Sequence, residues 1–469
     1  MPPRAPSALS RFSGLHPATK ATSLRCLHTS RPGHASLTTT SPVQASFEGL
    51  TKRSSAAPTT SERTTLACLP LSQVLRTYLI TSVSSSPTFL AASQNILTRL
   101  LSSSSWLTDV ERNPLINLAL RETFYKQFCA GEDKPSAREC MQQLQKIGYH
   151  GVILEYALEV LKDAKDADEG KDVEVWRQGL LETIDMARPG DFVGLKWSGL
   201  GTAAYKRMRA SDKPSPLMDS AMREVCEAAH TKTVHLLPAA EEVNTLDAFH
   251  KWTLNMQSAY NRGPAGSIVY STYQAYLRST ADILSHHLAT ANKEGFTHGI
   301  KLVRGAYLGS EERHFIWDSA EATHANYDGI AAALLRRKFD APLTAAIPEQ
   351  KFPEINVMLA THNVATTRKA QAIRKEQVEN GEELTPLKYA QLQGMADEVS
   401  CELLAEARGI DTADAPQVFK CTTWGTMTQC LNYLLRRAAE NKDAAGRTSG
   451  SRTAMGQELK RRMFASVGL

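Results

Sequence analysis

Residues 299–307 have the sequence Gly-Ile-Lys-Leu-Val-Arg-Gly-Ala-Tyr, a short apolar run that carries Lys301 and is closed by Arg304 and a glycine. Such a run predicts a buried strand, Gly299–Val303, that opens into a polar loop. Seven similar runs occur elsewhere in the chain, and longer helical patterns separate them. These seven predicted strands are Phe124–Cys129, Phe192–Lys196, Val234–Leu237, Ser267–Tyr270, Ile355–Ala360, Lys388–Leu392 and Val418–Cys421.

The alternation of strands with helices is typical of parallel sheets with crossover connections. One helical pattern, for example, places Val173, Trp176 and Leu180 on one face at spacings of three and four residues. Eight strand–helix units over roughly 320 residues predict an α/β fold of the (β/α)8 barrel type, with insertions. A doubly wound parallel sheet is the alternative.

The composition excludes several classes of protein. The chain has 469 residues, of which 42% are apolar and 22% charged, so a folded core is expected. Its eight cysteines form no Cys-x-x-Cys pair and no cluster with histidine at zinc spacing, which predicts free thiols and no metal site. Five cations in the first 47 residues account for the net charge of +5 and leave the rest of the chain near neutral, so the charge gives no indication of a nucleic-acid partner. No stretch is long and apolar enough to predict a membrane-spanning helix.

The two ends of the chain differ from the middle. Residues 1–47 are rich in Ser and Arg and contain no Asp or Glu, which is typical of a disordered mitochondrial presequence, with a disordered polar tail as the alternative. Residues 48–120 predict a variable helical segment whose apolar faces pad the main domain or touch a membrane surface, and padding is the preferred interpretation. Residues 121–445 are expected to form the main domain. Residues 446–469 are expected to be a C-terminal tail that starts with a flexible break.

Polar residues gather where the predicted strands end, which is where barrel enzymes carry their catalytic groups. After the last strand, a helix carries Arg436, Arg437 and Glu440 on one face. Each of these residues alone has an ordinary structural explanation, such as a solvated ion pair or a core histidine, but clusters at six or seven strand ends together indicate a site. The candidates at the strand ends are Lys196, Asp247, Gln274, Lys301, Arg304, Gly305, Tyr307, Thr361, His362, Asn363 and Leu392.

In this order, the motifs resemble those of the proline dehydrogenase family in its mitochondrial, fungal form. Residues 301–307, Lys-Leu-Val-Arg-Gly-Ala-Tyr, resemble the fifth-strand motif of the family, and residues 433–441, Tyr-Leu-Leu-Arg-Arg-Ala-Ala-Glu-Asn, resemble its substrate-clamp helix. The resemblance extends from about residue 128 to residue 441. The other matching motifs are Gly194-Leu195-Lys196, Asp247-Ala248, Thr272-Tyr273-Gln274-Ala275-Tyr276, Ala360-Thr361-His362-Asn363 and Leu392-Gln393-Gly394-Met395.

The resemblance implies a distorted (β/α)8 barrel that holds FAD non-covalently. It implies oxidation of L-proline to Δ1-pyrroline-5-carboxylate by hydride transfer to the flavin, the first step of proline catabolism to glutamate. Electrons would pass to quinone, with peripheral contact on the matrix side of the mitochondrial inner membrane. The residues implied to contact the flavin are Asp247, Gln274, Lys301, Arg304, Gly305, Thr361, His362 and Asn363. Those implied to bind proline are Lys196, Tyr307, Leu392, Arg436, Arg437 and Glu440, and Lys301 joins the last three as implied catalytic residues.

The implied roles are chemically reasonable, because paired guanidinium groups match a planar carboxylate and a cation can stabilise a reduced flavin. Three departures from the family pattern leave alternatives open. The cations Lys301 and Arg304 are exchanged relative to bacterial relatives, and Phe249 replaces the glutamate of the motif Asp-Ala-Glu that usually follows the third strand. Cys421 replaces the tyrosine of the pattern Tyr-x-Pro-x-Gly. The alternatives are a 4-hydroxyproline dehydrogenase of the same family, an aldolase with a Schiff-base lysine, and a non-catalytic paralogue.

Overall fold

The computed structural model describes residues 64–102, 105, 107–157, 168–263, 266–410, 414–440 and 445–466, without the side chains of residues 87, 438–440 and 445–449. The predicted presequence and residues 48–63 of the predicted helical segment lie outside the described residues. The described chain forms one compact unit from residue 64 onward.

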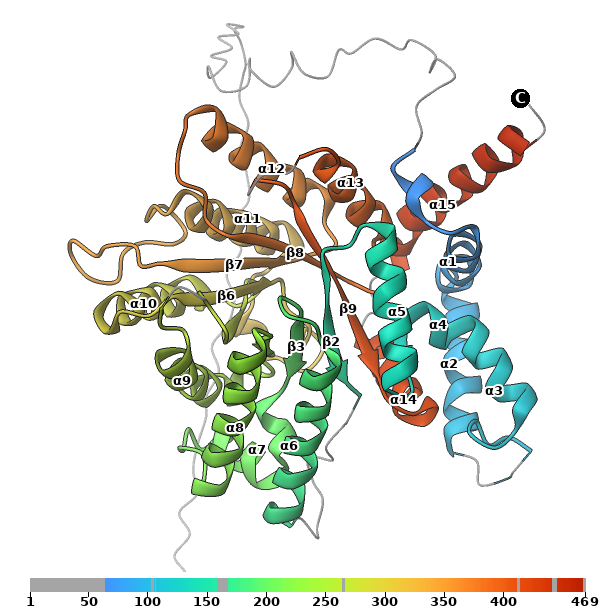
Figure 1. Cartoon of the computed structure of the whole chain (residues 1–469), viewed down its shortest axis with the longest axis horizontal. Helices are drawn as coiled ribbons and strands as arrows, with labels where there is room; N and C mark the ends of the chain where they lie inside the picture. The colour runs from blue at the N-terminus through green and yellow to red at the C-terminus, as the bar shows by residue number, and fades with distance from the viewer. Residues whose placement is uncertain are drawn as a thin grey trace, which may run out of the picture. The chain divides into compact units, whose positions relative to one another are not determined.

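Eight parallel strands form the centre of this unit (Figure 1). Hydrogen bonds connect them in the order β4-β3-β2-β9-β8-β7-β6-β5, and an isolated bridge between Leu236 and Val269 brings β4 next to β5. The (β/α)8 barrel prediction is therefore confirmed. The strands are β2 (Gly151–Tyr156), β3 (Phe192–Leu195), β4 (His235–Pro238), β5 (Tyr270–Gln274), β6 (His298–Val303), β7 (Ile355–Ala360), β8 (Leu387–Leu392) and β9 (Gln417–Trp424), and a short β1 (Cys129–Gly131) pairs with β9.

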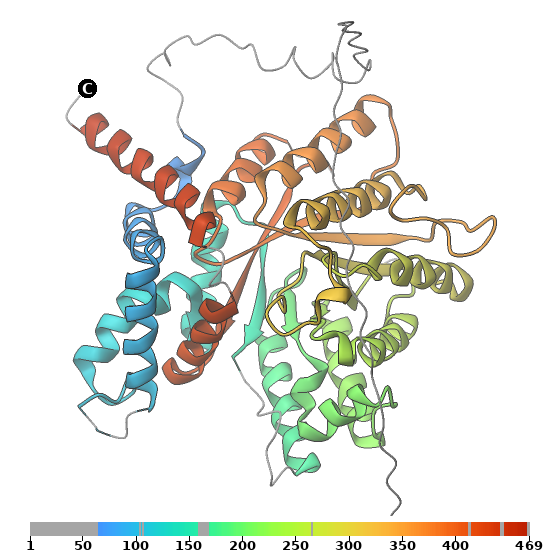
Figure 2. The ribbon, with the colours of Figure 1, turned by 180° about the vertical axis from the view of Figure 1, so that it is seen from behind.

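Helices surround the strands on their outer side, as the two opposite views show (Figure 2). Several begin at residues with short polar side chains, which accept hydrogen bonds from the first turn of the helix: Asp133, Asp168, Ser215, Ser319 and Asn363. The helices are α5 (Lys134–Ile147), α6 (Glu169–Met186), α7 (Thr202–Arg209), α8 (Pro216–Lys232), α9 (Val243–Tyr260), α10 (Thr280–Glu294), α11 (Ala320–Arg336), α12 (Val364–Glu379), α13 (Asp397–Ala407) and α14 (Met427–Glu440).

Two of the predicted strands need correction. The run Phe124–Cys129 is not a barrel strand: a π-helical turn (Arg121–Tyr125) continues into α4 (Lys126–Phe128), and only Cys129 belongs to β1. The true first barrel strand, β2, was missed. The predicted strand Ser267–Tyr270 lies early, because β5 begins at its last residue. The other six overlap their observed strands.

Apolar side chains fill the interior of the barrel. Alternate residues of each strand point inward, so residues that pair across neighbouring strands meet there, as Ile153 does with Phe192 and Cys421. The cluster consists of Ile153, Phe192, Leu237, Tyr270, Met358, Ala390, Phe419 and Cys421, with Ala360 and Leu392 packed against it. This cluster forms an apolar floor, and the polar residues at the strand ends lie beyond it.

Additional helices cover one side of the barrel: α1 (Leu71–Ser84), α2 (Pro87–Ser102), α3 (Pro114–Leu120) and α15 (Ala445–Ser466). Helix α15 packs on α1, and Arg462 donates hydrogen bonds to the carbonyl groups of Leu66 and Leu69, at 3.2 and 2.9 Å. Glu458, 1% exposed, accepts hydrogen bonds from Arg461 and Arg462. The flexible break predicted after residue 445 was therefore wrong, and the basic end of the chain is part of the folded structure.

Among the described residues, no helix is both long and apolar enough to cross a membrane.

Candidate active site at the mouth of the barrel

Lys196 and Glu241 form an ion pair where β3 and β4 end. The Nζ atom of Lys196 lies 3.1 Å from Oε1 of Glu241, and their side chains are 36% and 4% exposed. Burial lowers the pKa of Lys196, but Glu241 and Tyr307 raise it by more, so the pKa lies above its usual value. Lys196 is therefore an ammonium at neutral pH.

Glu241 also organises the neighbouring strand, because the side-chain amide of Gln274 donates a 2.9 Å hydrogen bond to the Glu241 carbonyl group. Gln274 ends β5 and is 3% exposed. The sequence analysis missed Glu241 and placed the acidic residue of this region at Asp247. The structure places Asp247 on α9, more than half exposed, in an ion pair with Lys251.

The residues that directly follow β4 explain this difference. They are Ala239, Ala240 and Glu241, so a buried acidic residue comes three positions after the strand ends. Phe249 is a buried residue of α9.

Tyr307 lies in the loop that follows β6, within electrostatic reach of Lys196. Burial raises its pKa, and the cations Lys196, Arg437 and Arg436 oppose that shift. The loop turns at Gly305, whose φ of +134° is unfavourable for other residues and whose added Cβ would lie 2.2 Å from the ring of Tyr276. This glycine allows the chain to bring Tyr307 back over the mouth.

Arg436 and Arg437 lie on α14, where both guanidinium groups approach the ring of Tyr433. Their Cζ atoms are 5.6 and 5.3 Å from the ring centroid, and Nε of Arg437 donates to the Tyr433 hydroxyl group at 3.3 Å. Burial raises the pKa of Tyr433, so the phenol stays neutral. Lys196, Tyr307 and the two arginines thus come together at one place. Glu440 is on the same helix, but its side chain lies outside the described residues.

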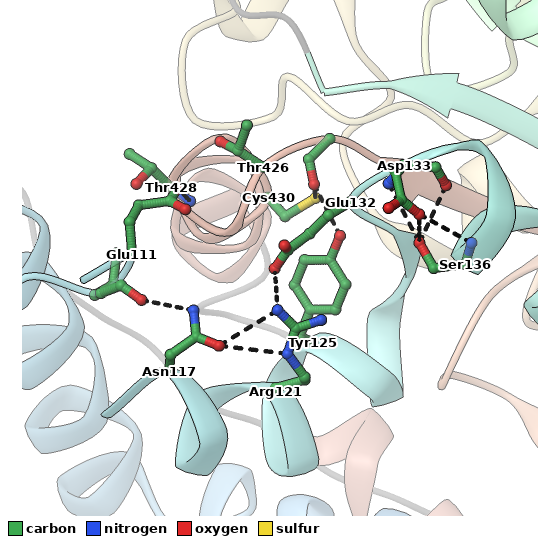
Figure 3. A network of polar contacts seen from close by, with 12 residues as sticks. Glu111, Asn117, Arg121, Tyr125, Glu132, Asp133, Ser136, Thr426, Thr428 and Cys430 are labelled. Carbon is green, nitrogen blue, oxygen red and sulfur yellow. Dashed lines mark hydrogen bonds and ion pairs between the residues drawn. The ribbon is translucent and has the colours of Figure 1, made fainter. Parts of the chain in front are cut away.

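The N-terminal helices hold the start of α14 in place (Figure 3). The Tyr125 hydroxyl group donates a 2.8 Å hydrogen bond to the Gly425 carbonyl group, and the backbone amide of Thr428 donates to Glu111 at 2.9 Å. The Tyr125 ring packs with Met427 and other apolar residues on the inner side of α14. Sequence patterns gave no sign of these contacts, since they join segments about 300 residues apart.

Lys301 and Cys421 point into the barrel from β6 and β9. The side chain of Lys301 is partly buried, and among the described residues no hydrogen bond or ion pair holds its ammonium group. Cys421 belongs to the interior cluster, and burial, together with Glu155, raises the pKa of its thiol. Glu155, on the missed strand β2, is a second acidic residue that the sequence analysis did not identify.

Arg304 points toward β7 and α12, away from the two inward-facing residues. It donates hydrogen bonds to His324, Thr361 and Thr366, at 2.9, 2.7 and 2.8 Å, and its guanidinium group lies 4.3 Å from the Tyr327 ring centroid. These contacts fix a cation beside the end of β7.

His362 and Asn363 have structural contacts that the sequence did not reveal. Nε2 of His362 accepts a 3.1 Å hydrogen bond from the backbone amide of Leu392, which joins the ends of β7 and β8, and Asn363 caps α12. The loop after Leu392 is anchored by Lys420, whose Nζ atom lies 2.8 Å from Asp397 and donates to the Met395 carbonyl group. His362, Asn363 and Lys420 therefore hold the loops at the ends of β7 and β8 in place.

The described residues contain no group of three or more His, Cys, Asp or Glu side chains that could hold a metal ion.

Comparisons with known proteins agree with this arrangement. Residues 137–450 match the sequence profile of the family described as proline dehydrogenase. The chain is 29% identical, over 406 residues, to the probable mitochondrial proline dehydrogenase of Schizosaccharomyces pombe, covering 75% of this chain and 81% of that protein. It is 27% identical, over 420 residues, to the hydroxyproline dehydrogenase of Mus musculus, covering 79% of this chain and 88% of that protein.

Among solved structures, proline utilization A (PutA) from Bdellovibrio bacteriovorus, inactivated by N-propargylglycine, superposes with a TM-score of 0.58 at 16% identity. The match covers 76% of this chain but only 37% of that longer chain, so it supports the fold alone. The family profile spans more than half of the sequence, including β2 to β9 and the helix with the paired arginines. The chain therefore belongs to the proline dehydrogenase family of oxidoreductases.

Proposed function

We propose that this protein oxidises L-proline to Δ1-pyrroline-5-carboxylate, with FAD as the resident cofactor and quinone as the electron acceptor. The observation that carries the proposal is the convergence of Lys196, Arg436 and Arg437 at the mouth of the barrel. Two guanidinium groups and an ammonium group suit a planar carboxylate, which every amino acid presents. The neighbouring Tyr307 and Leu392 would cover the ring and exclude water.

The residues at the mouth fit a flavin. An ammonium group without an ionic partner among the described residues, Lys301, faces the space above the apolar floor, where an electron-accepting ring would gain from a nearby cation. Gln274 and Arg304 lie at the ends of β5 and β6, where they offer an amide and a fixed positive charge. Bound there, FAD would accept the hydride that the substrate carbon loses.

The protein's own contribution is then to orient the substrate. Because the pKa of Lys196 is raised, this lysine remains charged and binds the carboxylate rather than accepting a proton. The same property argues against the aldolase alternative at Lys196, since a Schiff-base lysine requires a lowered pKa. The partly buried Arg437 is held by Tyr433, so the clamp is ordered before substrate arrives.

The absorption spectrum of the purified protein tests the proposal. We expect a flavin spectrum that bleaches on anaerobic addition of L-proline and recovers when a soluble quinone is added. A flavin spectrum that L-proline leaves unchanged would favour a non-catalytic paralogue, whereas a colourless protein that retains no FAD after reconstitution would contradict the cofactor assignment.

The hydroxyproline alternative has specific support. Cys421 faces the interior where the family pattern has a tyrosine, and a thiol leaves more room for a ring hydroxyl group. Several relatives are named hydroxyproline dehydrogenase, including those of Mus musculus and Bos taurus. Comparing kcat/KM for L-proline and 4-hydroxyproline decides between the two substrates.

We further propose a mitochondrial location, on the matrix side of the inner membrane, with peripheral contact to lipid. Residues 63–108 contain three arginines and no acidic residue. Helix α1 buries Val74 in the protein, so it does pad the domain, but its other face exposes Leu71, Leu75 and Leu79, at 56%, 47% and 56%. An exposed apolar helix face suits the boundary between headgroups and acyl chains of a bilayer, and a segment without acidic residues avoids repulsion from an anionic surface.

Vesicle binding tests this contact. We expect the protein to float with vesicles that contain anionic phospholipid and the double variant Leu75→Ser/Leu79→Ser to remain in solution. If both proteins behave alike, α1 does not form the contact.

A further inference from the structure

Two cysteines outside the barrel mouth lie close enough to react with one another. Cys68 ends a short 3-10 helix (Thr65–Cys68), and Cys401 lies on α13, 333 residues later in the sequence. Their Sγ atoms are 3.5 Å apart. Cys68 is half-buried, whereas Cys401 is fully buried among Leu66, Leu69 and Met455. The Cys68 thiol is therefore accessible to a small oxidant, and the buried Cys401 thiol lies next to it.

The surroundings of Cys68 favour its thiolate form. The hydrogen bond with Cys401 lowers the pKa of Cys68 to about 7, with help from Arg408 and against the effects of burial and of Asp397. A thiolate is the nucleophilic form of cysteine, so Cys68 is reactive near neutral pH.

The other described thiols lack this combination. Burial raises the pKa of Cys226 to about 12 and that of Cys140 to about 11. Cys129 and Cys430 form a second close pair, but the thiol of Cys129 is buried and its pKa is raised well above the usual value. The first pair is thus distinguished by geometry and accessibility, and the second pair serves as an internal control.

We propose that Cys68 and Cys401 form a hydroperoxide-sensitive modification site. The Cys68 thiolate attacks the terminal oxygen of the hydroperoxide; an S–O bond forms, the O–O bond breaks, and an alcohol or water leaves after taking up a proton. The Cys401 thiol then attacks the sulfenic acid on Cys68; the S–S bond forms, the S–O bond breaks, and water leaves with the Cys401 proton. Two electrons pass from the two thiols to the hydroperoxide.

The disulfide would fasten the N-terminal segment to the barrel. The sulfurs must approach from 3.5 Å to a bond length of about 2.05 Å, a small movement at the end of a short helix. Helix α13 begins at Asp397, which already accepts a 3.1 Å hydrogen bond from Gln73 of α1. The covalent link would thus reinforce an existing contact between these segments.

Peptide mapping of the full-length, reduced protein after treatment with hydrogen peroxide tests the site. We expect a Cys68–Cys401 linked peptide in the wild type, with a mass lower than that of the two reduced peptides by two hydrogen atoms. In Cys401→Ser, we expect Cys68 to accumulate as a sulfenic acid that dimedone traps, and in Cys68→Ser we expect Cys401 to remain reduced. Cys226→Ser, the matched control, should form the disulfide as the wild type does.

A second measurement needs no mutation, so it stands even if a variant fails to fold. In the wild type, iodoacetamide should label Cys68 at least tenfold faster than Cys129, Cys226 or Cys430 at pH 7. The proposal is wrong if Cys68 is not the fastest of these thiols, or if peroxide links Cys129 to Cys430 while Cys68 and Cys401 remain reduced.

Discussion

Replacing Glu241 by glutamine changes the charge of the candidate site while keeping its shape. Glu241 is the buried carboxylate that faces Lys196 at 3.1 Å, and it is a main reason why the pKa of Lys196 lies above its usual value. Without this charge, burial and Arg436 act on Lys196 largely unopposed, so its pKa should fall. The ammonium group would then lose its proton at a lower pH than in the wild type.

The size of the effect follows from the exposure of the pair. A hydrogen bond between charged groups contributes roughly 1.5–3 kcal/mol, and because 36% of the Lys196 side chain is exposed, the lower end of that range applies. About 1.5 kcal/mol corresponds to an about tenfold larger ratio of neutral to charged Lys196 at a given pH, and carboxylate binding weakens to the extent that Lys196 is neutral. The weakening should be greatest at alkaline pH, where Lys196 of the variant is neutral and Lys196 of the wild type is still charged.

The assay should measure carboxylate binding without the titration of the substrate amine. Cyclopentanecarboxylate keeps the ring and the carboxylate of proline but has no amine, so its inhibition constant reports on the protein groups. From pH 7 to pH 9.5, we expect this constant to rise more in Glu241→Gln than in the wild type, by up to about tenfold.

The matched control is Glu242→Gln, the same chemical change one residue later. Glu242 accepts a long hydrogen bond, 3.4 Å, from Tyr205 and lies at the start of α9. It should leave the pH dependence unchanged. If Glu241→Gln and Glu242→Gln give the same profile as the wild type, Lys196 does not bind the carboxylate and the proposed site loses its third cation.

Other changes test the remaining parts of the site and the fold. Arg436→Met or Arg437→Met should raise KM for proline by about 10- to 150-fold, the equivalent of roughly 1.5–3 kcal/mol, while the bound flavin spectrum persists; unchanged steady-state constants in both variants would exclude the clamp. Cys421→Tyr should raise kcat/KM for proline relative to 4-hydroxyproline by about tenfold, and an unchanged ratio would show that this position does not contact the ring. Burial lowers the pKa of His235 and His287 to about 4. Below about pH 6.5, these histidines therefore bind protons in the unfolded chain but remain neutral in the folded chain until the pH approaches 4. Stability should therefore fall from pH 6.5 toward pH 4, by about 2 kcal/mol for each histidine at pH 5; urea unfolding midpoints that are flat over this range would contradict that account.

The sequence identified most barrel strands because their apolar runs are short and bounded by polar residues. It failed at β2, although Val152, Ile153 and Leu154 form such a run. A short apolar run does not show by itself whether it forms a strand or a helix. The aromatic run Phe124–Cys129 was therefore predicted as the first barrel strand in place of β2. In the structure, that run continues a helix and packs against α14. The missed strand also hid Glu155.

The candidate site was found in part for a similar reason. Strand ends can be located from sequence, so Lys196 and Gln274 were predicted to lie in one site, and both of them contact Glu241. The sequence does not show in the same way where a loop ends and the next helix begins. Glu241 lies in the loop directly after β4, whereas Asp247 is already on the second turn of α9 and faces outward to Lys251.

The orientation of Cys421 shows where pattern reasoning reaches its limit. In a barrel whose outer surface is covered by helices, both faces of a strand are buried, so alternation of apolar and polar residues does not reveal which face is inside. Lys420 would suggest a solvent-facing side, yet it is 1% exposed on the outer face of β9, where Asp397 compensates its charge. The opposite face therefore carries Cys421 into the barrel.

Trp424 lies on the outer face of β9, where its ring stacks on Tyr156 at 4.7 Å and its indole N–H donates a hydrogen bond to Thr183. This ring therefore cannot fill the space beside the Cys421 thiol. The space beside the Cys421 thiol is consequently not taken by Trp424, and the substitution Cys421→Tyr measures directly whether the ring of the substrate uses this space.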